Sequence, residues 1–177
     1  MTHLKYFILA TAFGLSLGAA VSRETQTVAT KMGAVSVEEV KFSKGSANLN
    51  DSEKRALDQL VKNANKQKVK EVRVLAWADR EYPKQDEKVS DSQVNLANER
   101  GRAIKDYLHE KFSATFETYN MAERPNKLEQ VLNTSDHDVK ATMEKTGAAP
   151  TSQDATGLFG LKGKATHALV FVIPDKE

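Results

Sequence analysis

The stretch LAWADREYPKQDEKVSDSQVNLANERGRAIKDYL, residues 75–108, holds the end of an apolar strand, a long polar loop and an amphipathic helix. The strand begins near Lys68 and alternates with period two, with apolar residues on both faces, which is typical of an interior strand. Asp79 ends it. The helix begins at Asp91, and Arg100 lies on the flank of its apolar stripe. That stripe predicts a helix packed on the sheet and consists of Val94, Ala97, Gly101, Ile104 and Leu108.

The flanking segments continue the alternation of strand and helix. Residues 35–42 predict a first strand, with a bulge where Glu38 and Glu39 interrupt the alternation. An amphipathic helix follows, capped by Asn50 or Ser52. Residues 114–119 and 166–174 predict the third and last strands, and residues 126–164 a helical insertion with Asn126 and Ser135 as candidate caps. The order predicts an α+β sandwich with helices on one face of a four-stranded sheet.

Length and composition fit one domain, because the chain has 177 residues, of which 40% are apolar and 28% charged. Residues 1–20 contain one lysine, an apolar run over 6–17 and small residues at 18 and 20, which predicts a secretory signal peptide. An uncleaved anchor is the alternative, since a spanning helix needs about 20 apolar residues. Residues 21–34 are polar and predict a linker, which leaves 35–177 as the domain.

The chain lacks residues that several classes of function require. The chain has no cysteine, which excludes disulfides, thiolate metal sites, a cysteine nucleophile and lipid attachment to cysteine. The net charge of +2 falls to +1 without Lys5, so no basic footprint for nucleic acid exists. The sequence has no Ser/His/Asp spacing typical of a catalytic triad and no glycine-rich phosphate-binding loop. We therefore expect that the protein is not an enzyme and binds no cofactor. The run SDHD, residues 135–138, is interpreted as a helix cap rather than a metal site.

Asp79 and Arg100 are the residues that suit a ligand. An acid and a base held near each other, but not bound to each other, would recognise a ligand with an ammonium and a carboxylate on one carbon. Gln93 lies on the same flank of the helix as Arg100 and borders the same place. The alternative is an ordinary ion pair between Asp79 and Arg100, or an aspartate that caps its loop.

Three segments together resemble the OmpA-like C-terminal domain, the peptidoglycan-binding module of Gram-negative envelopes. They are FSKGSANL (42–49), VLAWAD (74–79) and NLANERGRAIKDYL (95–108). The resemblance extends over residues 35–124 and, more weakly, the last strand. It implies that Asp79 and Arg100 grip the free amino acid end of diaminopimelate in the stem peptide, and that Gln93 replaces the family's asparagine.

The sequence also departs from that family. The loop after Asp79 is longer and holds Pro83, Gly101 replaces an alanine, and the insertion at about 126–164 is extra. The family's Asn-Arg-Arg before the last strand is missing, which leaves His167 as a candidate second basic contact. The expected function is non-covalent peptidoglycan binding in the periplasm or cell envelope, with alanine at Asp79 or Arg100 abolishing binding but not folding. The alternative is a degenerate OmpA-like fold that acts as a protein-interaction module and binds an envelope protein through the insertion.

Overall fold

The computed structural model describes residues 21–64, 68–126, 132, 134–155 and 161–175. The predicted signal peptide, residues 1–20, lies outside this part of the chain. The elements are α1 (Arg23–Met32), β1 (Ser36–Lys41), α2 (Asp51–Ala64), β2 (Val69–Ala76), α3 (Asp91–His109), β3 (Thr115–Asn120), α5 (Ser135–Lys145) and β4 (His167–Pro174).

The four strands form one mixed sheet in the order β1-β4-β2-β3. Strand β4 is antiparallel to both β1 and β2, whereas β2 and β3 are parallel and are joined by the crossover helix α3. The registers place Ala76 beside both Asn120 and Ala168. The end of β2, the end of β3 and the start of β4 therefore meet at one edge, directly before Asp79. The predicted α+β class is confirmed, as is the predicted order of elements from β1 to β4.

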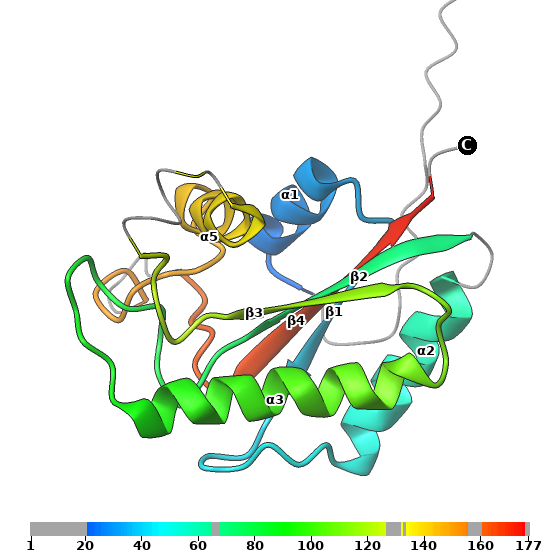
Figure 1. Ribbon diagram of the computed structural model, residues 1–177, viewed down its shortest axis with the longest axis horizontal. Helices are drawn as coiled ribbons and strands as arrows, with labels where there is room; N and C mark the ends of the chain where they lie inside the picture. Colours follow the sequence, from blue (N-terminus) through cyan, green and yellow to red (C-terminus); the bar gives the residue numbers. More distant parts are fainter. Residues whose placement is uncertain (1–20, 65–67, 127–131, 133, 156–160, 176–177) are drawn as a thin grey trace, which may run out of the picture.

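Helices cover both faces of the sheet, not one (Figure 1). Helices α2 and α3 pack on the face that carries Val72, Val74 and Val170. Helices α1 and α5 cover the other face, where Leu75 and Trp77 are fully buried. The prediction of helices on a single face is corrected, because the second apolar face of β2 needs its own cover.

Residues 23–32 form helix α1 where the sequence predicts a linker. The side chain of Ser22 caps the helix by accepting a hydrogen bond from the Thr25 amide, and Gly33 ends it in the left-handed conformation with φ 69°. Val28 and Ala29 on its inner side are fully buried in the core. The apolar stripe is short, which is why periodicity did not reveal the helix.

The insertion and the long loop after β2 pack on each other. Helix α5 buries Val139 and Met143 against Tyr82 of the loop. The guanidinium of Arg124 lies over the ring of Tyr82 at 4.7 Å and donates to the Pro83 carbonyl. The N-cap of α5 is Thr134, one residue before the predicted cap Ser135. Residues 127–131, which directly follow the other predicted cap, Asn126, lie outside the described residues.

Strand β1 has no bulge. Residues 36–41 pair one to one with β4, so Glu38 points to the α2 side of the sheet and Glu39 to the opposite side. Both glutamates are nonetheless buried, at 5% and 9% exposed. The predicted slip is wrong, because the alternation is unbroken and acids occupy two inward positions. The observed irregularity lies instead at the start of β2, between Val69 and Glu71.

Gly101 leaves room for a methyl group between α3 and the sheet. A Cβ there would lie 3.7 Å from the Ala76 Cβ and 3.8 Å from the Thr118 Cβ, which is ordinary van der Waals contact. Because glycine disfavours a helix interior, Gly101→Ala should raise the free energy of unfolding by about 1 kcal/mol in urea titrations. Gly33→Ala, at φ 69°, should lower it. Equal or reduced stability of Gly101→Ala would contradict this packing.

Among the described residues, no helix combines the length and the apolar character that crossing a membrane requires.

Candidate functional site

Asp79 and Arg100 meet at the sheet edge where β2 ends. The backbone of β2 continues past Ala76, because the Trp77 amide donates to the His167 carbonyl at 3.0 Å. Asp79 follows two residues later and faces α3. One carboxylate oxygen, Oδ1, lies 2.6 Å from Nη2 of Arg100. The fold thus joins two side chains that are 21 residues apart in sequence.

Arg100 is fully buried and bound by oxygens on several sides. Its Nε donates to the Ser46 carbonyl at 2.9 Å, its Nη1 to the Trp77 carbonyl at 2.9 Å and its Nη2 to the Ser43 carbonyl at 3.1 Å. Its guanidinium carbon also lies 5.1 Å from the centre of the Phe42 ring. Arg100 was expected at the border of the apolar stripe. The structure buries it, because four oxygens compensate the lost water.

Asp79 is similarly enclosed. Its second oxygen, Oδ2, accepts a hydrogen bond from the Gly45 amide at 2.6 Å, and 9% of its side chain is exposed. Its backbone amide donates to Oε1 of Gln93 at 3.0 Å, so Gln93 lies beside the pair. All three predicted site residues are therefore brought together. Asp79 and Arg100 are bound to each other and to the backbone of residues 43–46, which we call the Ser43–Ser46 turn.

His167 lies away from this site. It shares a sheet face with Leu169 and Phe171, and its Nε2 is 3.6 Å from Oε1 of Glu39. Its Nδ1 is 2.7 Å from the Ala165 carbonyl oxygen. Among the described residues, no hydrogen bond or ion pair joins His167 to Asp79 or Arg100. Its expected role as a second basic contact is therefore not supported by its position.

A second ionic cluster, which the sequence did not reveal, surrounds Glu39. Nζ of Lys164 lies 2.6 Å from one carboxylate oxygen, and Nζ of Lys162 lies 2.9 Å from the other. Lys164 is fully buried. Burial opposes ionisation of Glu39, but the hydrogen bonds from Lys164 and Lys162 lower its pKa below the ordinary value. Burial lowers the pKa of Lys164, against the hydrogen bond to Glu39, which raises it.

Glu81 fixes the chain just before β4. Its two carboxylate oxygens accept hydrogen bonds from the amides of Lys164 and Ala165, at 2.6 and 3.0 Å. A Cβ at Gly163 would collide with Oε1 of Glu81, so a side chain at this position would displace that carboxylate. Glu39 and Glu81 thus hold the segment directly before β4. These acids have a structural role in the observed geometry.

Glu38 makes the stability of the domain depend on pH. Burial, and then the charges of Glu53 and Glu39, raise its pKa from 4.5 to about 7. The folded state therefore holds this proton more tightly than the unfolded state does. Its contribution to stability is complete below about pH 4.5 and is lost as the pH rises to about 7.

Glu38→Gln should remove this loss, because the amide stays neutral at every pH. Urea titrations at pH 4.5 and pH 8 should show that the variant gains up to about 3 kcal/mol over the wild type between the two, at about 1.4 kcal/mol per pKa unit. The exposed Glu99→Gln is the control on α3 and should leave the pH dependence unchanged. The same pH dependence in Glu38→Gln and the wild type would contradict the raised pKa.

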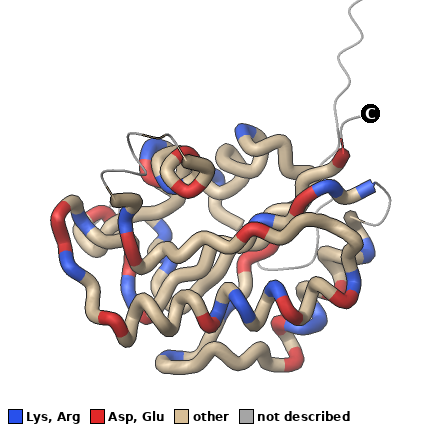
Figure 2. The backbone as a smooth tube through the Cα atoms, viewed as in Figure 1, with Lys and Arg blue, Asp and Glu red and all other residues tan. Residues whose placement is uncertain are grey.

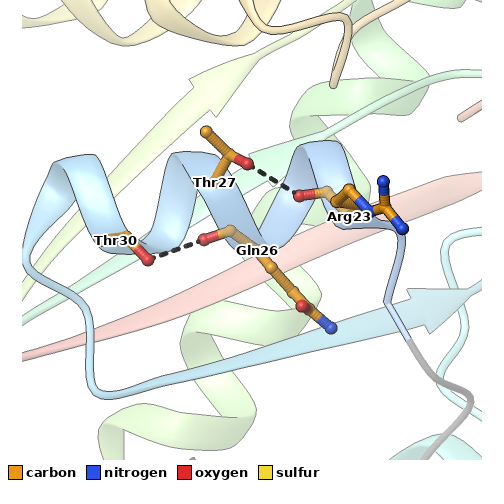
Figure 3. Close-up of a pocket in the computed structure, with 4 residues that line it drawn as sticks. All are labelled: Arg23, Gln26, Thr27 and Thr30. Carbon is orange, nitrogen blue, oxygen red and sulfur yellow. Dashed lines mark hydrogen bonds between the residues drawn. The ribbon is translucent and has the colours of Figure 1, made fainter. Parts of the chain in front are cut away.

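A shallow hollow of about 250 Å³ lies along α1 and is lined by Arg23, Gln26, Thr27 and Thr30 (Figure 3). The hydroxyls of Thr27 and Thr30 donate to carbonyls of their own helix. Nothing in this lining converges on a ligand. Basic and acidic residues are interspersed along the described part of the chain (Figure 2). No group of three or more potential metal ligands occurs within the described ranges.

Comparisons with known proteins leave the family open. No protein-family model matches the chain, and no curated protein matches it either. Among solved structures, the OmpA-like domain of FopA1 from Francisella tularensis subsp. tularensis SCHU S4 is 16% identical, with 80% of this chain and 74% of that chain covered and a TM-score of 0.37. A MotB-like protein from Desulfovibrio vulgaris is 11% identical, with 87% and 89% covered and a TM-score of 0.33. At these TM-scores, neither likeness assigns a function.

Proposed function

We propose that this domain binds peptidoglycan non-covalently, without catalysis, through the diaminopimelate end of a stem peptide. The observation that carries the proposal is the meeting of Asp79, Arg100 and Gln93 at one edge of the sheet. The acid comes from the end of β2 and the base from the crossover helix α3. The resemblance of residues 42–49, 74–79 and 95–108 to the OmpA-like domain points to the same three positions.

The chemistry of the three side chains matches a free amino acid. The carboxylate of Asp79 would pair with the ligand's ammonium group. The planar guanidinium of Arg100 would take the ligand carboxylate through two parallel hydrogen bonds. Gln93 and the neighbouring loop backbone would add hydrogen bonds. Peptidoglycan lies in the cell envelope, so this function agrees with the signal peptide expected at residues 1–20 and would place the protein in the periplasm or cell envelope.

A second candidate function follows from the closed state of the pair. Arg100 has no exposed surface and is bound by four oxygens, as in an ion pair that only stabilises the fold. The domain would then be a degenerate OmpA-like fold that has lost peptidoglycan binding and binds an envelope protein through the insertion, residues 126–164. Leu132 in the insertion is 65% exposed and could contact a partner. Val139 and Met143 of α5 are buried in the core of the domain and are not available to one. We therefore rank this function second.

Pelleting with purified peptidoglycan of the diaminopimelate type separates the two functions. Residues 21–177 contain every described element and should pellet with the polymer. Asp79→Asn keeps the side-chain shape but removes the charge, and it should abolish pelleting. Asp106→Asn, at an exposed position of α3, should not. Full pelleting by a folded Asp79→Asn variant would overturn the assigned site.

If the second function is correct, crosslinking of the full chain in envelope extracts should capture one protein through residues 126–164. A crosslink that disappears when this segment is altered, together with no pelleting, would favour the protein-interaction module.

A further inference from the structure

The Ser43–Ser46 turn presents Asp79 and Arg100 with the same groups as a free amino acid. The carbonyls of Ser43 and Ser46 accept hydrogen bonds from Arg100, as the two oxygens of a ligand carboxylate would. The amide of Gly45 donates to Asp79, as a ligand ammonium would. Two acceptors and one donor from a single short segment thus satisfy both halves of the site.

We propose that this turn is a built-in substitute for the ligand, which must move off Arg100 before a stem peptide can bind. The inference rests on the proposed function. In the closed state Arg100 is fully buried, so a ligand carboxylate reaches it only when the carbonyls of Ser43 and Ser46 leave. Binding then exchanges one set of hydrogen bonds for an equivalent set, which is what a reversible lid requires.

The turn is held in a way that suits local opening. Its ends are fixed, because the Phe42 amide donates to the Thr166 carbonyl at 2.7 Å, and Asn50 caps α2 through hydrogen bonds from Ser52 and Glu53. Residues 43–45 between these ends are exposed. Two apolar residues between these ends, Ala47 and Leu49, pack on core clusters, and both are only partly buried. Segments with so little apolar burial open at low free-energy cost.

If only open molecules bind the ligand, the apparent affinity equals the intrinsic affinity multiplied by the fraction of molecules in which the turn is open. Gly45 allows this fraction to be changed without touching the ligand-binding groups. It has φ 69°, and a Cβ there meets nothing within 4 Å. Alanine at position 45 therefore strains the closed turn by its backbone alone. The expected result is about fivefold tighter binding of diaminopimelate by Gly45→Ala than by the wild type.

Gly33 provides a matched control. It also has φ 69° and nothing within 4 Å of its Cβ, but it ends α1 on the opposite face of the sheet. Gly33→Ala should therefore impose the same backbone strain without any change in affinity. A general loosening of the fold would affect the two variants alike, whereas opening of the turn affects only Gly45→Ala.

The experiment is calorimetric titration of meso-diaminopimelate into residues 21–177 carrying wild-type, Gly45→Ala or Gly33→Ala sequence. Tighter binding by Gly45→Ala alone supports the lid. Equal or weaker binding by Gly45→Ala, with the wild type binding, overturns the lid and leaves the proposed function in place. No binding by any of the three folded proteins overturns both.

Amide exchange gives an independent reading of the same step. At saturating diaminopimelate, the Gly45 amide loses its acceptor on Asp79 and should exchange faster. The Asp79 amide, which is bonded to Gln93, should remain protected. Slower exchange at Gly45 in the bound protein would mean that the turn stays closed over the ligand, and would overturn the proposal.

Discussion

Arg100→Ala is expected to lower the free energy of unfolding by about 3–5 kcal/mol. The variant leaves the nearly buried carboxylate of Asp79 without its counterion and removes the donor from the carbonyls of Ser43, Ser46 and Trp77. It also leaves a cavity where a fully buried side chain had been. Urea unfolding at pH 7, followed by circular dichroism, measures the loss.

Arg102→Ala is the matched control, because Arg102 is an exposed arginine two residues further along α3. It should change stability by less than about 0.5 kcal/mol. Similar small losses in both variants would contradict the buried, saturated state of Arg100. The expectation that alanine at position 100 spares the fold is thus replaced. Binding is tested with Asp79→Asn because asparagine keeps a side-chain oxygen that can accept a hydrogen bond from Arg100.

Glu39→Ala is expected to have a comparable effect, about 3–5 kcal/mol. Glu39 and Lys164 are both buried, and their charged groups lie 2.6 Å apart. Without the carboxylate, the buried ammonium of Lys164 loses the acid that binds it directly, and Lys162 loses its partner as well. The same urea titration at pH 7 measures the loss.

The double variant Glu39→Ala with Lys164→Met separates charge burial from packing. Removing both charges leaves no unpaired ion, and methionine fills much of the space of the lysine stem. The double variant should therefore recover most of the stability that Glu39→Ala loses. A double variant no more stable than Glu39→Ala alone would contradict an electrostatic origin.

The sequence predicted the part of the fold that depends on periodicity. The alternation in β2 and the three-and-four spacing in α3 belong to single segments of chain, so the residues themselves carry the signal. The two apolar faces of β2 also indicated an interior strand. The same observation already implied a cover on the second face, where Leu75 and Trp77 are buried beneath α1 and α5. Ser22 and Gly33, placed as caps, were the available signal for α1.

The state of the candidate site could not be predicted in the same way. A helical projection places Arg100 on the flank of its stripe, but it says nothing of what lies opposite. The three carbonyls that bind Arg100 come from residues 23, 54 and 57 positions away. Glu39 and Lys164 are 125 positions apart. Tertiary contacts at such separations leave no local pattern in the residues that make them.

The most direct test of the central claim is competition in a peptidoglycan pelleting assay. Residues 21–177 are mixed with purified diaminopimelate-type peptidoglycan, with and without an excess of free meso-diaminopimelate. Pelleting that the free amino acid abolishes is the predicted result, because the amino acid would occupy the groups of Asp79 and Arg100 that the stem peptide needs. No pelleting by the folded protein, or pelleting that free diaminopimelate leaves unchanged, would contradict the account.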